Sequence, residues 1–331
     1  NSYEALLNED QKEREAKLEI FIPNGPRLGN KVIEAQHVAK AFGDKLLFDD
    51  LNFMLPPNGI VGVIGPNGAG KSTVMKMILN LIQPEAGEVQ LFGEKVTDQS
   101  YEVFKRVGSI IENPYFYEKM TARQNLELHC DYMGFPNKER IDEVLQMVDL
   151  QNVEGKQIRH YSLGMKQRLA IARAILAKPE FLILDEPINA LDPEGIREMR
   201  NLFQRLNQED ETTIFISSHI LSEVDLIADT IGIIQHGNLL AELPIEEIHK
   251  HQTEYISLQV DDVAHAATLL EQMDITNFSV LDQEFIRIYD SNISGKVLSK
   301  ALIESGVGLE SLGRKQDTLE DYFFQLTEEG K

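Results

Sequence analysis

The sequence predicts an α/β fold in which helices alternate with the strands of a mostly parallel sheet. Short apolar runs of strand length recur along the chain, separated by segments with helical patterning. This alternation favours parallel strands covered by helices on both faces. A glycine-rich loop joins one such strand to a helix, and acidic or histidine side chains follow two others. The ends of such strands are where ligands bind in sheets of this kind.

Composition limits the possible partners. The chain has 331 residues, which favours two domains, and it is 42% hydrophobic, enough for packed cores. The net charge of −22 disfavours direct nucleic-acid binding, which needs an excess of Lys and Arg. No apolar run reaches the roughly 20 residues that span a bilayer, so any membrane part is expected in another chain. The single cysteine, Cys130, fits a reducing cytoplasm.

The first elements lead to the glycine-rich loop. Residues 1–30 are predicted to be a charged helix followed by a linker rich in proline and glycine. Two strands, Val32–Val38 and Leu46–Leu55, are expected to pair in an antiparallel subdomain. The buried strand Ile60–Ile64 and the helix Thr73–Leu81 then enclose the loop.

That loop reads Gly65-Pro66-Asn67-Gly68-Ala69-Gly70-Lys71-Ser72-Thr73 and matches G-x-x-x-x-G-K-[ST], the phosphate-binding P-loop. Its position between a strand and a helix is the context that supports such a match. The glycines let backbone N–H groups turn toward phosphate oxygens, and the helix adds the positive end of its dipole. We expect Lys71 to contact the β- and γ-phosphates and Ser72 to bind Mg²⁺.

A helical insertion is predicted after the P-loop. Strands at Gly87–Phe92 and Val107–Ile111 come first. Tyr115–Leu150 is predicted to be mostly helical, interrupted at Gly134 and a nearby proline. A helical subdomain of about residues 113–178 is therefore inserted into the α/β core.

Two later strands end in side chains that suit phosphate chemistry. Phe181–Leu184 is apolar and leads into Asp185 and Glu186. Asp185 suits the outer shell of Mg²⁺, and Glu186 suits polarisation of an attacking water. The strand Thr212–Ile216 is followed shortly by His219, which we expect to contact the γ-phosphate. Beside a P-loop, these roles are favoured over solvated turns.

The pattern of predicted strands and helices changes near residue 240. This change divides a domain of residues 31–240 from an accessory domain of residues 241–331. The accessory elements are predicted at Tyr255–Val260, Val263–Met273, Phe278–Leu281, Phe285–Tyr289, Ile293–Ser305 and Gly308–Leu312. Their order, β-α-β-β-α-β, is that of a ferredoxin-like α+β domain. A last helix is predicted at Thr318–Thr327.

Over about residues 31–240, these motifs together resemble the ATP-binding cassette (ABC) ATPase family. The P-loop resembles Walker A, and Phe181–Glu186 resembles Walker B with its catalytic glutamate. His219 resembles the switch histidine, and Phe42 stands where an adenine-stacking aromatic is expected. The resemblance implies a P-loop NTPase with a parallel sheet core, an antiparallel β subdomain and an inserted helical subdomain, which binds ATP and Mg²⁺.

Two further motifs support this resemblance and imply a dimer. Tyr161-Ser-Leu-Gly-Met-Lys-Gln167 resembles the signature loop LSGGQ, matching it at Ser162 and Gly164 and departing from it at the residue after each. Ala190-Leu191-Asp192 resembles the D-loop. In this family two cassettes meet head to tail, so Ser162, Gly164 and Asp192 are expected to act on the ATP held by a second copy.

From about residue 74 to the end, the chain resembles the cassettes of bacitracin-resistance and lantibiotic-immunity transporters. These carry a glutamate, here Glu112, where most cassettes have glutamine; a carboxylate in that place is a candidate Mg²⁺ ligand. The resemblance implies a cytoplasmic subunit on the inner face of the membrane. It would use ATP hydrolysis to energise a separate permease that exports peptide antibiotics and contacts the helical subdomain.

The opening has a different resemblance. Residues 1–73 resemble the linker and the start of the second cassette in ABC-F translation factors. This leaves two alternatives open: a ribosome-associated ATPase, and a chimeric chain joined near the P-loop. The acidic charge, the single cassette and the long helical insertion favour the transporter subunit.

Overall fold

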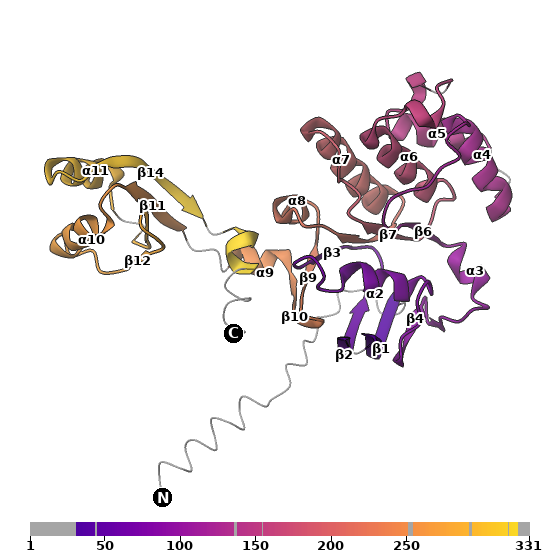
Figure 1. The fold of residues 1–331 in the computed structure, drawn as a ribbon, viewed down its shortest axis with the longest axis horizontal. Helices are drawn as coiled ribbons and strands as arrows, with labels where there is room; N and C mark the ends of the chain where they lie inside the picture. Colours follow the sequence, from indigo (N-terminus) through magenta and orange to yellow (C-terminus); the bar gives the residue numbers. More distant parts are fainter. Residues whose placement is uncertain are drawn as a thin grey trace, which may run out of the picture.

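The computed structural model describes residues 31–43, 45–135, 138–153, 155–250, 254–290, 293–316 and 318–323. The predicted charged helix and linker, residues 1–30, lie outside the described residues. The described part of the chain forms three β-sheets with helices packed against them (Figure 1). Among the helices described, none is both long enough and apolar enough to cross a membrane.

The central sheet has six strands in the order β10-β9-β3-β8-β7-β6. They are β3 (Ile60–Ile64), β6 (Val107–Ile110), β7 (Phe181–Asp185), β8 (Thr213–Ser217), β9 (Thr230–Gln235) and β10 (Asn238–Pro244). All pairs are parallel except that of β10 with β9, which confirms the predicted parallel core. Every residue of β3, β7 and β8 is buried, as expected for strands covered on both faces.

Alternate residues of these strands face two different cores, because side chains alternate across a strand. On one side, Leu182 and Leu184 pack against the helical layer. On the other side, Phe181 and Ile183 pack against the antiparallel sheet and the helix that follows the P-loop. We call residues 31–240 the nucleotide-binding unit, after the role predicted for its P-loop. The helices that precede the third sheet along the chain are α2 (Lys71–Ile78), α3 (Tyr101–Phe104), α4 (Ala122–Met133), α5 (Arg140–Met147), α6 (Leu163–Ile175), α7 (Pro193–Glu209), α8 (Leu221–Asp225) and α9 (Ile245–Lys250).

The second sheet has the order β2-β1-β4-β5 and is antiparallel. Its strands are β1 (Ile33–Phe42), β2 (Lys45–Leu55), β4 (Ala86–Leu91) and β5 (Glu94–Lys95). This confirms the predicted antiparallel subdomain. The hairpin of β1 and β2 pairs Phe42 with Lys45, and both residues line one pocket together with the P-loop.

The helical layer differs from the prediction at its start. Helix was predicted from residue 115, but α4 begins at Ala122. Thr121 fixes this start because its side chain accepts the Gln124 N–H while the Gln124 side chain accepts the Thr121 N–H, a capping box. The helix ends at Met133 and is capped by Gly134, which has a φ of 64°, in agreement with the predicted break. Two short 3-10 helices follow α5, at Gln151–Val153 and Ile158–His160.

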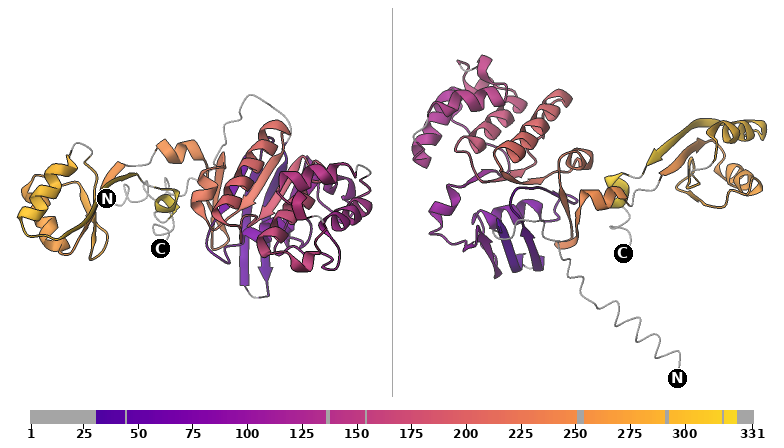
Figure 2. Two further views of the ribbon diagram at one scale, coloured as in Figure 1. Left: turned by 90° about the horizontal axis from the view of Figure 1, so that it is seen from above. Right: turned by 180° about the vertical axis from the view of Figure 1, so that it is seen from behind.

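The third sheet has the order β12-β13-β11-β14 and is antiparallel. Its elements follow the chain as β11 (Glu254–Val260), α10 (Val263–Gln272), β12 (Phe278–Val280), β13 (Phe285–Ile288), α11 (Gly295–Glu304) and β14 (Leu309–Gln316). This β-α-β-β-α-β order is the predicted ferredoxin-like arrangement. The unit has its own apolar core and stands apart from the central sheet in all three views (Figure 2).

A segment from the end of the described chain joins the two units. We call residues 318–323 the tail segment. Leu319 is buried in a cluster with residues of β10, α8 and α9 and with Ile64, the last residue of β3. Asp321 accepts a hydrogen bond at 2.6 Å from Arg287 of β13. Because β10 and α9 pack with the nucleotide-binding unit, we propose that this unit extends past residue 240, through α9.

Candidate active site

The P-loop connects β3 to α2, as the sequence pattern predicts. Gly70 precedes α2 with a φ of 112°, and a Cβ atom there would lie 2.3 Å from Phe48 Cζ. Both the backbone and the space therefore require glycine. The Lys71 ammonium turns back over the loop and donates to the Gly65 carbonyl at 2.5 Å. The loop thus surrounds the amino-terminal end of α2, where backbone N–H groups favour anions.

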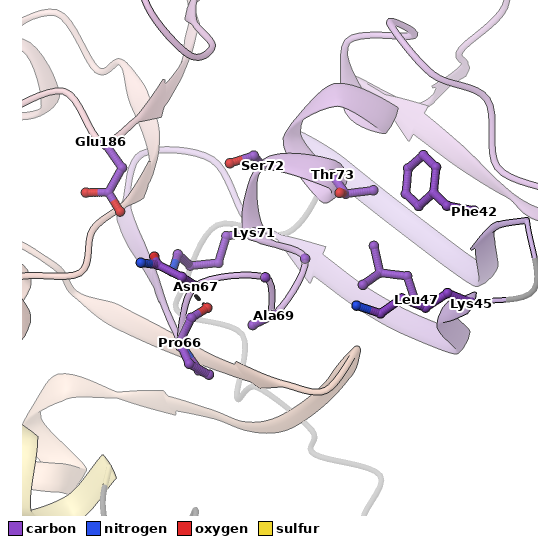
Figure 3. Close-up of a pocket in the computed structure, with 12 residues that line it drawn as sticks. Phe42, Lys45, Leu47, Pro66, Asn67, Ala69, Lys71, Ser72, Thr73 and Glu186 are labelled. Atoms are coloured by element: carbon purple, nitrogen blue, oxygen red, sulfur yellow. Dashed lines mark hydrogen bonds between the residues drawn. The ribbon is translucent and has the colours of Figure 1, made fainter.

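A pocket of about 330 Å³ lies over this loop (Figure 3). Its lining consists of Phe42, Lys45, Leu47, Pro66, Asn67, Gly68, Ala69, Gly70, Lys71, Ser72, Thr73 and Glu186. Phe42 is 53% exposed, so its ring is accessible to a planar group such as a base. The pocket therefore combines an anion-binding loop, an aromatic face and one carboxylate.

The two predicted carboxylates meet at a buried serine. Asp185 ends β7 and lies beside Ser217 of β8 in the sheet register. The Ser217 hydroxyl donates to Asp185 Oδ1 at 2.6 Å and accepts the Glu186 N–H at 3.0 Å. Asp185 is only 6% exposed and Ser217 is fully buried. A buried carboxylate needs such a donor, because it has lost hydrogen bonds to water.

The structure also brings Glu186 and His219 together. Glu186 has a φ of 49° and lines the pocket on the side away from Phe42, with the P-loop between the two side chains (Figure 3). Its Oε2 atom lies 2.7 Å from His219 Nδ1 and accepts the His219 backbone N–H at 3.3 Å. The histidine therefore orients the carboxylate toward the pocket.

Electrostatics tie the P-loop to these carboxylates. Burial lowers the pKa of Lys71, while the negative charges of Glu186 and Asp185 oppose this shift. The Lys71 ammonium therefore interacts electrostatically with both carboxylates, at the place where phosphate charge would be bound.

Glu112 lies outside this pocket lining. It has a φ of 58° and forms an ion pair with Lys76 of α2. Its side chain is 63% exposed. The proposed Mg²⁺ contact of Glu112 stays a prediction, and the structure adds a cationic partner that the sequence did not indicate.

The signature and D-loop residues lie apart from the P-loop pocket, at the starts of two helices. Ser162 caps α6 by accepting the Met165 N–H at 3.2 Å. Asp192 caps α7 by accepting the Gly195 N–H at 3.1 Å. A Cβ atom on Gly164 would lie 3.0 Å from the Ala190 carbonyl oxygen, so the two loops are closely packed. Neither loop lines the P-loop pocket of its own chain.

Few protein groups are available for a metal. Over the described ranges, no three His, Cys, Asp or Glu side chains are grouped so that they could hold a metal ion. The Ser72 hydroxyl and the buried Asp185 carboxylate are oxygen ligands of the kind Mg²⁺ prefers. They fit a Mg²⁺ that takes its other ligands from phosphates and water.

Sequence reasoning missed three residues at this site. Lys45 and Leu47 line the pocket because β2 returns beside Phe42. The position just after the predicted hairpin could have indicated them. Ser217 belongs to no motif. Its only signal was its place at the end of a buried strand, two residues before His219.

Comparisons with known proteins agree with this site. A family model described as "ABC transporter" matches residues 48–189. The chain is 43% identical to the "Bacitracin transport ATP-binding protein BcrA" of Bacillus licheniformis, covering 89% of this chain and 97% of that protein. It is 38% identical to the "Lantibiotic transport ATP-binding protein SrtF" of Streptococcus pyogenes, covering 64% of this chain and 90% of that protein.

A solved structure is similar as well. The "Dimeric structure of a post-hydrolysis state of the ATP-binding cassette MJ0796 bound to ADP and Pi" has a TM-score of 0.59 and 25% identity, covering 64% of this chain and 98% of that chain. These similarities confirm the predicted cassette fold. They give no support to the ABC-F alternative or to a chimeric chain.

Proposed function

The chain belongs to the ATP-binding proteins of ABC transporters and is an ATPase, and from this premise we propose that it energises a separate permease that exports peptide antibiotics. The observation that carries the proposal is its similarity, over nearly the whole length of that protein, to a bacitracin transport ATP-binding protein. The similarity to a lantibiotic transport protein supports the same class of cargo.

We assign substrate binding to the P-loop pocket. The loop amides and Lys71 would hold the phosphates of ATP, and Phe42 would stack on the adenine. Lys45 and Leu47 complete the wall beside Phe42. With its phosphates against Lys71 and its base against the β1–β2 hairpin, ATP would bind in one favoured orientation.

We assign the hydrolytic step to Glu186 and His219. Glu186 would accept hydrogen bonds from the attacking water and polarise it, since an ionised carboxylate only accepts. The contact between His219 Nδ1 and Glu186 Oε2 holds this carboxylate at 2.7 Å. We propose that the other ring nitrogen of His219 would face the γ-phosphate. Phosphoryl transfer depends mostly on such positioning and on charge stabilisation.

Ser72 and Asp185 are the residues proposed to hold Mg²⁺, with Glu112 as a further candidate. The ion would neutralise developing charge on the phosphate oxygens. Asp185 is kept ready for this role by the Ser217 hydroxyl at 2.6 Å.

We propose that the working unit is a homodimer. Ser162, Gly164 and Asp192 lie outside the P-loop pocket of their own chain, so they would complete the pocket of a second copy. Ser162 also opens α6, whose amino-terminal end favours an anion such as the γ-phosphate. Binding of two ATP molecules would close the dimer, and hydrolysis would reopen it.

The permease is proposed to contact a groove that lies between the end of α2 and α3 on one side and helices α4 and α6 on the other. The groove has a volume of about 270 Å³, and its lining includes Leu81, Phe104, Met133 and Arg173. Leu81 is 62% exposed. An apolar segment with an acidic residue would fit this lining. Through it the chain would sit peripherally on the cytoplasmic face of the membrane.

The proposal is tested by capture followed by a resistance assay. Tagged Glu186→Gln protein, which should trap ATP, is incubated with ATP and a bacterial lysate, and the bound fraction is separated into membrane proteins and ribosomes. A captured multi-span protein is then co-expressed with the wild-type chain in a bacitracin-sensitive strain. Raised bacitracin tolerance that is lost with Glu186→Gln supports the proposal. Ribosome capture, or unchanged tolerance to bacitracin and to a lantibiotic, contradicts it.

A further inference from the structure

We propose that Ser217 is a positioning residue for ATP hydrolysis, because its hydroxyl holds Asp185 and Glu186 in their working arrangement. This inference rests on the proposed role of Glu186. Ser217 lies at the end of β8, in register with Asp185 of β7. It is part of no phosphate-binding motif and does not line the pocket, so it would act only through its two acidic neighbours.

The Ser217 hydroxyl donates one hydrogen bond and accepts another. A hydroxyl has one donor and two acceptor lone pairs. The Ser217 hydroxyl donates its hydrogen to Asp185 Oδ1, at 2.6 Å. The Glu186 N–H can only donate, so it uses a lone pair of the same oxygen, at 3.0 Å. One buried atom thus fixes the side chain of one acid and the backbone of the next.

The backbone contact matters because of the conformation of Glu186. Its φ of 49° lies in the left-handed region, which is costly for a residue with a Cβ atom and persists only where the surroundings hold it. Ser217 holds the peptide where the chain leaves β7, and His219 holds the carboxylate at the other end of the residue. If the contact of Ser217 with the backbone is lost, the contact of His219 alone does not fix the direction of the Glu186 carboxylate.

The site also explains why a hydroxyl is needed there. Ser217 has no exposed surface and Asp185 has 6%, so bulk water does not replace the missing donor without rearrangement. An alanine at 217 would leave a buried carboxylate with one donor fewer. Asp185 and the Glu186 peptide would then be free to reorient.

The test compares Ser217→Ala with Ser217→Thr, which keeps the hydroxyl, and with Ser218→Ala. Ser218 is an equally buried neighbour whose hydroxyl bonds only to Ile220 among the contacts the structure describes. We expect kcat for ATP hydrolysis to fall about tenfold in Ser217→Ala, as for loss of a hydrogen bond to a charged group. The Kd for a fluorescent ATP analogue should stay within about twofold, because the P-loop carries binding. Ser217→Thr and Ser218→Ala should keep most of the wild-type kcat.

A double-mutant cycle separates positioning from a general structural effect. In a Glu186→Gln background, Ser217→Ala should lower the residual turnover far less than in the wild type, because residues that act as a unit are not additive. Equal factors in both backgrounds would overturn the claim that Ser217 acts through Glu186, and a wild-type kcat in Ser217→Ala would overturn the whole inference. Full turnover in Glu186→Gln alone would instead refute the proposed role of Glu186. If Ser217→Ala does not fold, Ser217→Cys, with its weak donor, enters the same cycle.

Discussion

At the scale of single residues, Glu186 depends on the side chains that surround it. Its backbone N–H is bound by Ser217 and its carboxylate by His219, while its charge acts on Lys71. None of these contacts comes from a neighbour in the sequence. The chemistry of the site is therefore a property of three strands that end at the same edge of the sheet.

Glu186→Gln is the first residue-scale prediction. The amide cannot act as a base, so kcat should fall by about 100-fold or more, while ATP affinity is retained. Phosphate release and nucleotide binding measure the two effects separately. Glu194→Gln, an exposed change at the start of α7, serves as the control. Wild-type turnover in the first variant would show that another group polarises the water.

A second residue-scale prediction concerns pH. Glu242 of β10 lies beside apolar side chains such as Phe53 and Leu239, and burial raises its pKa from the ordinary 4.5 to about 7. Between these pH values the folded state binds more protons than the unfolded state, so this group makes stability fall as pH rises, with no further change above about 7.

Glu242→Gln should remove this loss. We expect the variant to match the wild type near pH 4.5 and to be more stable by up to about 3 kcal/mol at pH 8. Urea denaturation at both pH values measures the difference, with the exposed Glu246→Gln as control. An advantage that is the same at both pH values would count against titration of this glutamate.

The charged and histidine side chains of the site could be located from the sequence, whereas the residues that hold them in place could not. Lys71, Glu186 and His219 follow apolar strands, and the sheet brings strand ends together. Ser217 and the partner of Glu112 could not be found this way. A serine has many structural uses, and the pairing of Glu112 with Lys76 depends on how a loop folds against a helix far away in sequence.

At the scale of elements, α2 shows how closely the antiparallel sheet and the P-loop are fitted. The helix begins at Lys71 because Gly70 can adopt a φ of 112° against the ring of Phe48 from β2. The sequence predicted helix from Thr73 to Leu81, but the helix ends at Ile78, and Leu81 instead lines the groove beside it. Strand positions agreed better, because buried apolar runs leave little choice of element.

Gly70→Ala is the prediction for this element. The added Cβ would meet the Phe48 ring at 2.3 Å. We therefore expect the free energy of unfolding to fall by about 2 kcal/mol and the affinity for ATP to decrease. Gly93→Ala is the matched control, since Gly93 has a φ of 80° but no atom within 4 Å of its ideal Cβ. Equal losses in thermal or urea unfolding for the two variants would mean that backbone strain, not contact with Phe48, limits this position.

At the scale of the whole molecule, the tail segment links two units that have separate cores. Leu319 packs into the cluster that contains Ile64 and Val224, and Asp321 bonds to Arg287, whose guanidinium lies over the Tyr255 ring at 4.5 Å. The nucleotide-binding unit and the ferredoxin-like unit are thus joined by side chains as well as by the chain itself.

Leu319→Ala should weaken this link. Removing a side chain that is 1% exposed typically costs about 2–4 kcal/mol in a core, here concentrated on the docking of the tail segment. We expect faster limited proteolysis between the two units, measured by the masses of the fragments, and little change in ATP affinity. Val297→Ala, an exposed change on α11, is the control. An unchanged cleavage rate would show that the tail segment does not hold the units together.

The position of Leu319 has a consequence for how the protein is made. Ile64 emerges from the ribosome early, together with the P-loop, whereas the tail segment that helps to cover it is translated after both units. Until the tail segment has been translated, the apolar cluster around Ile64 therefore lacks the side chain of Leu319. A nascent chain halted just before the tail segment would therefore hold every residue that lines the P-loop pocket but would lack the side chain that completes this apolar cluster.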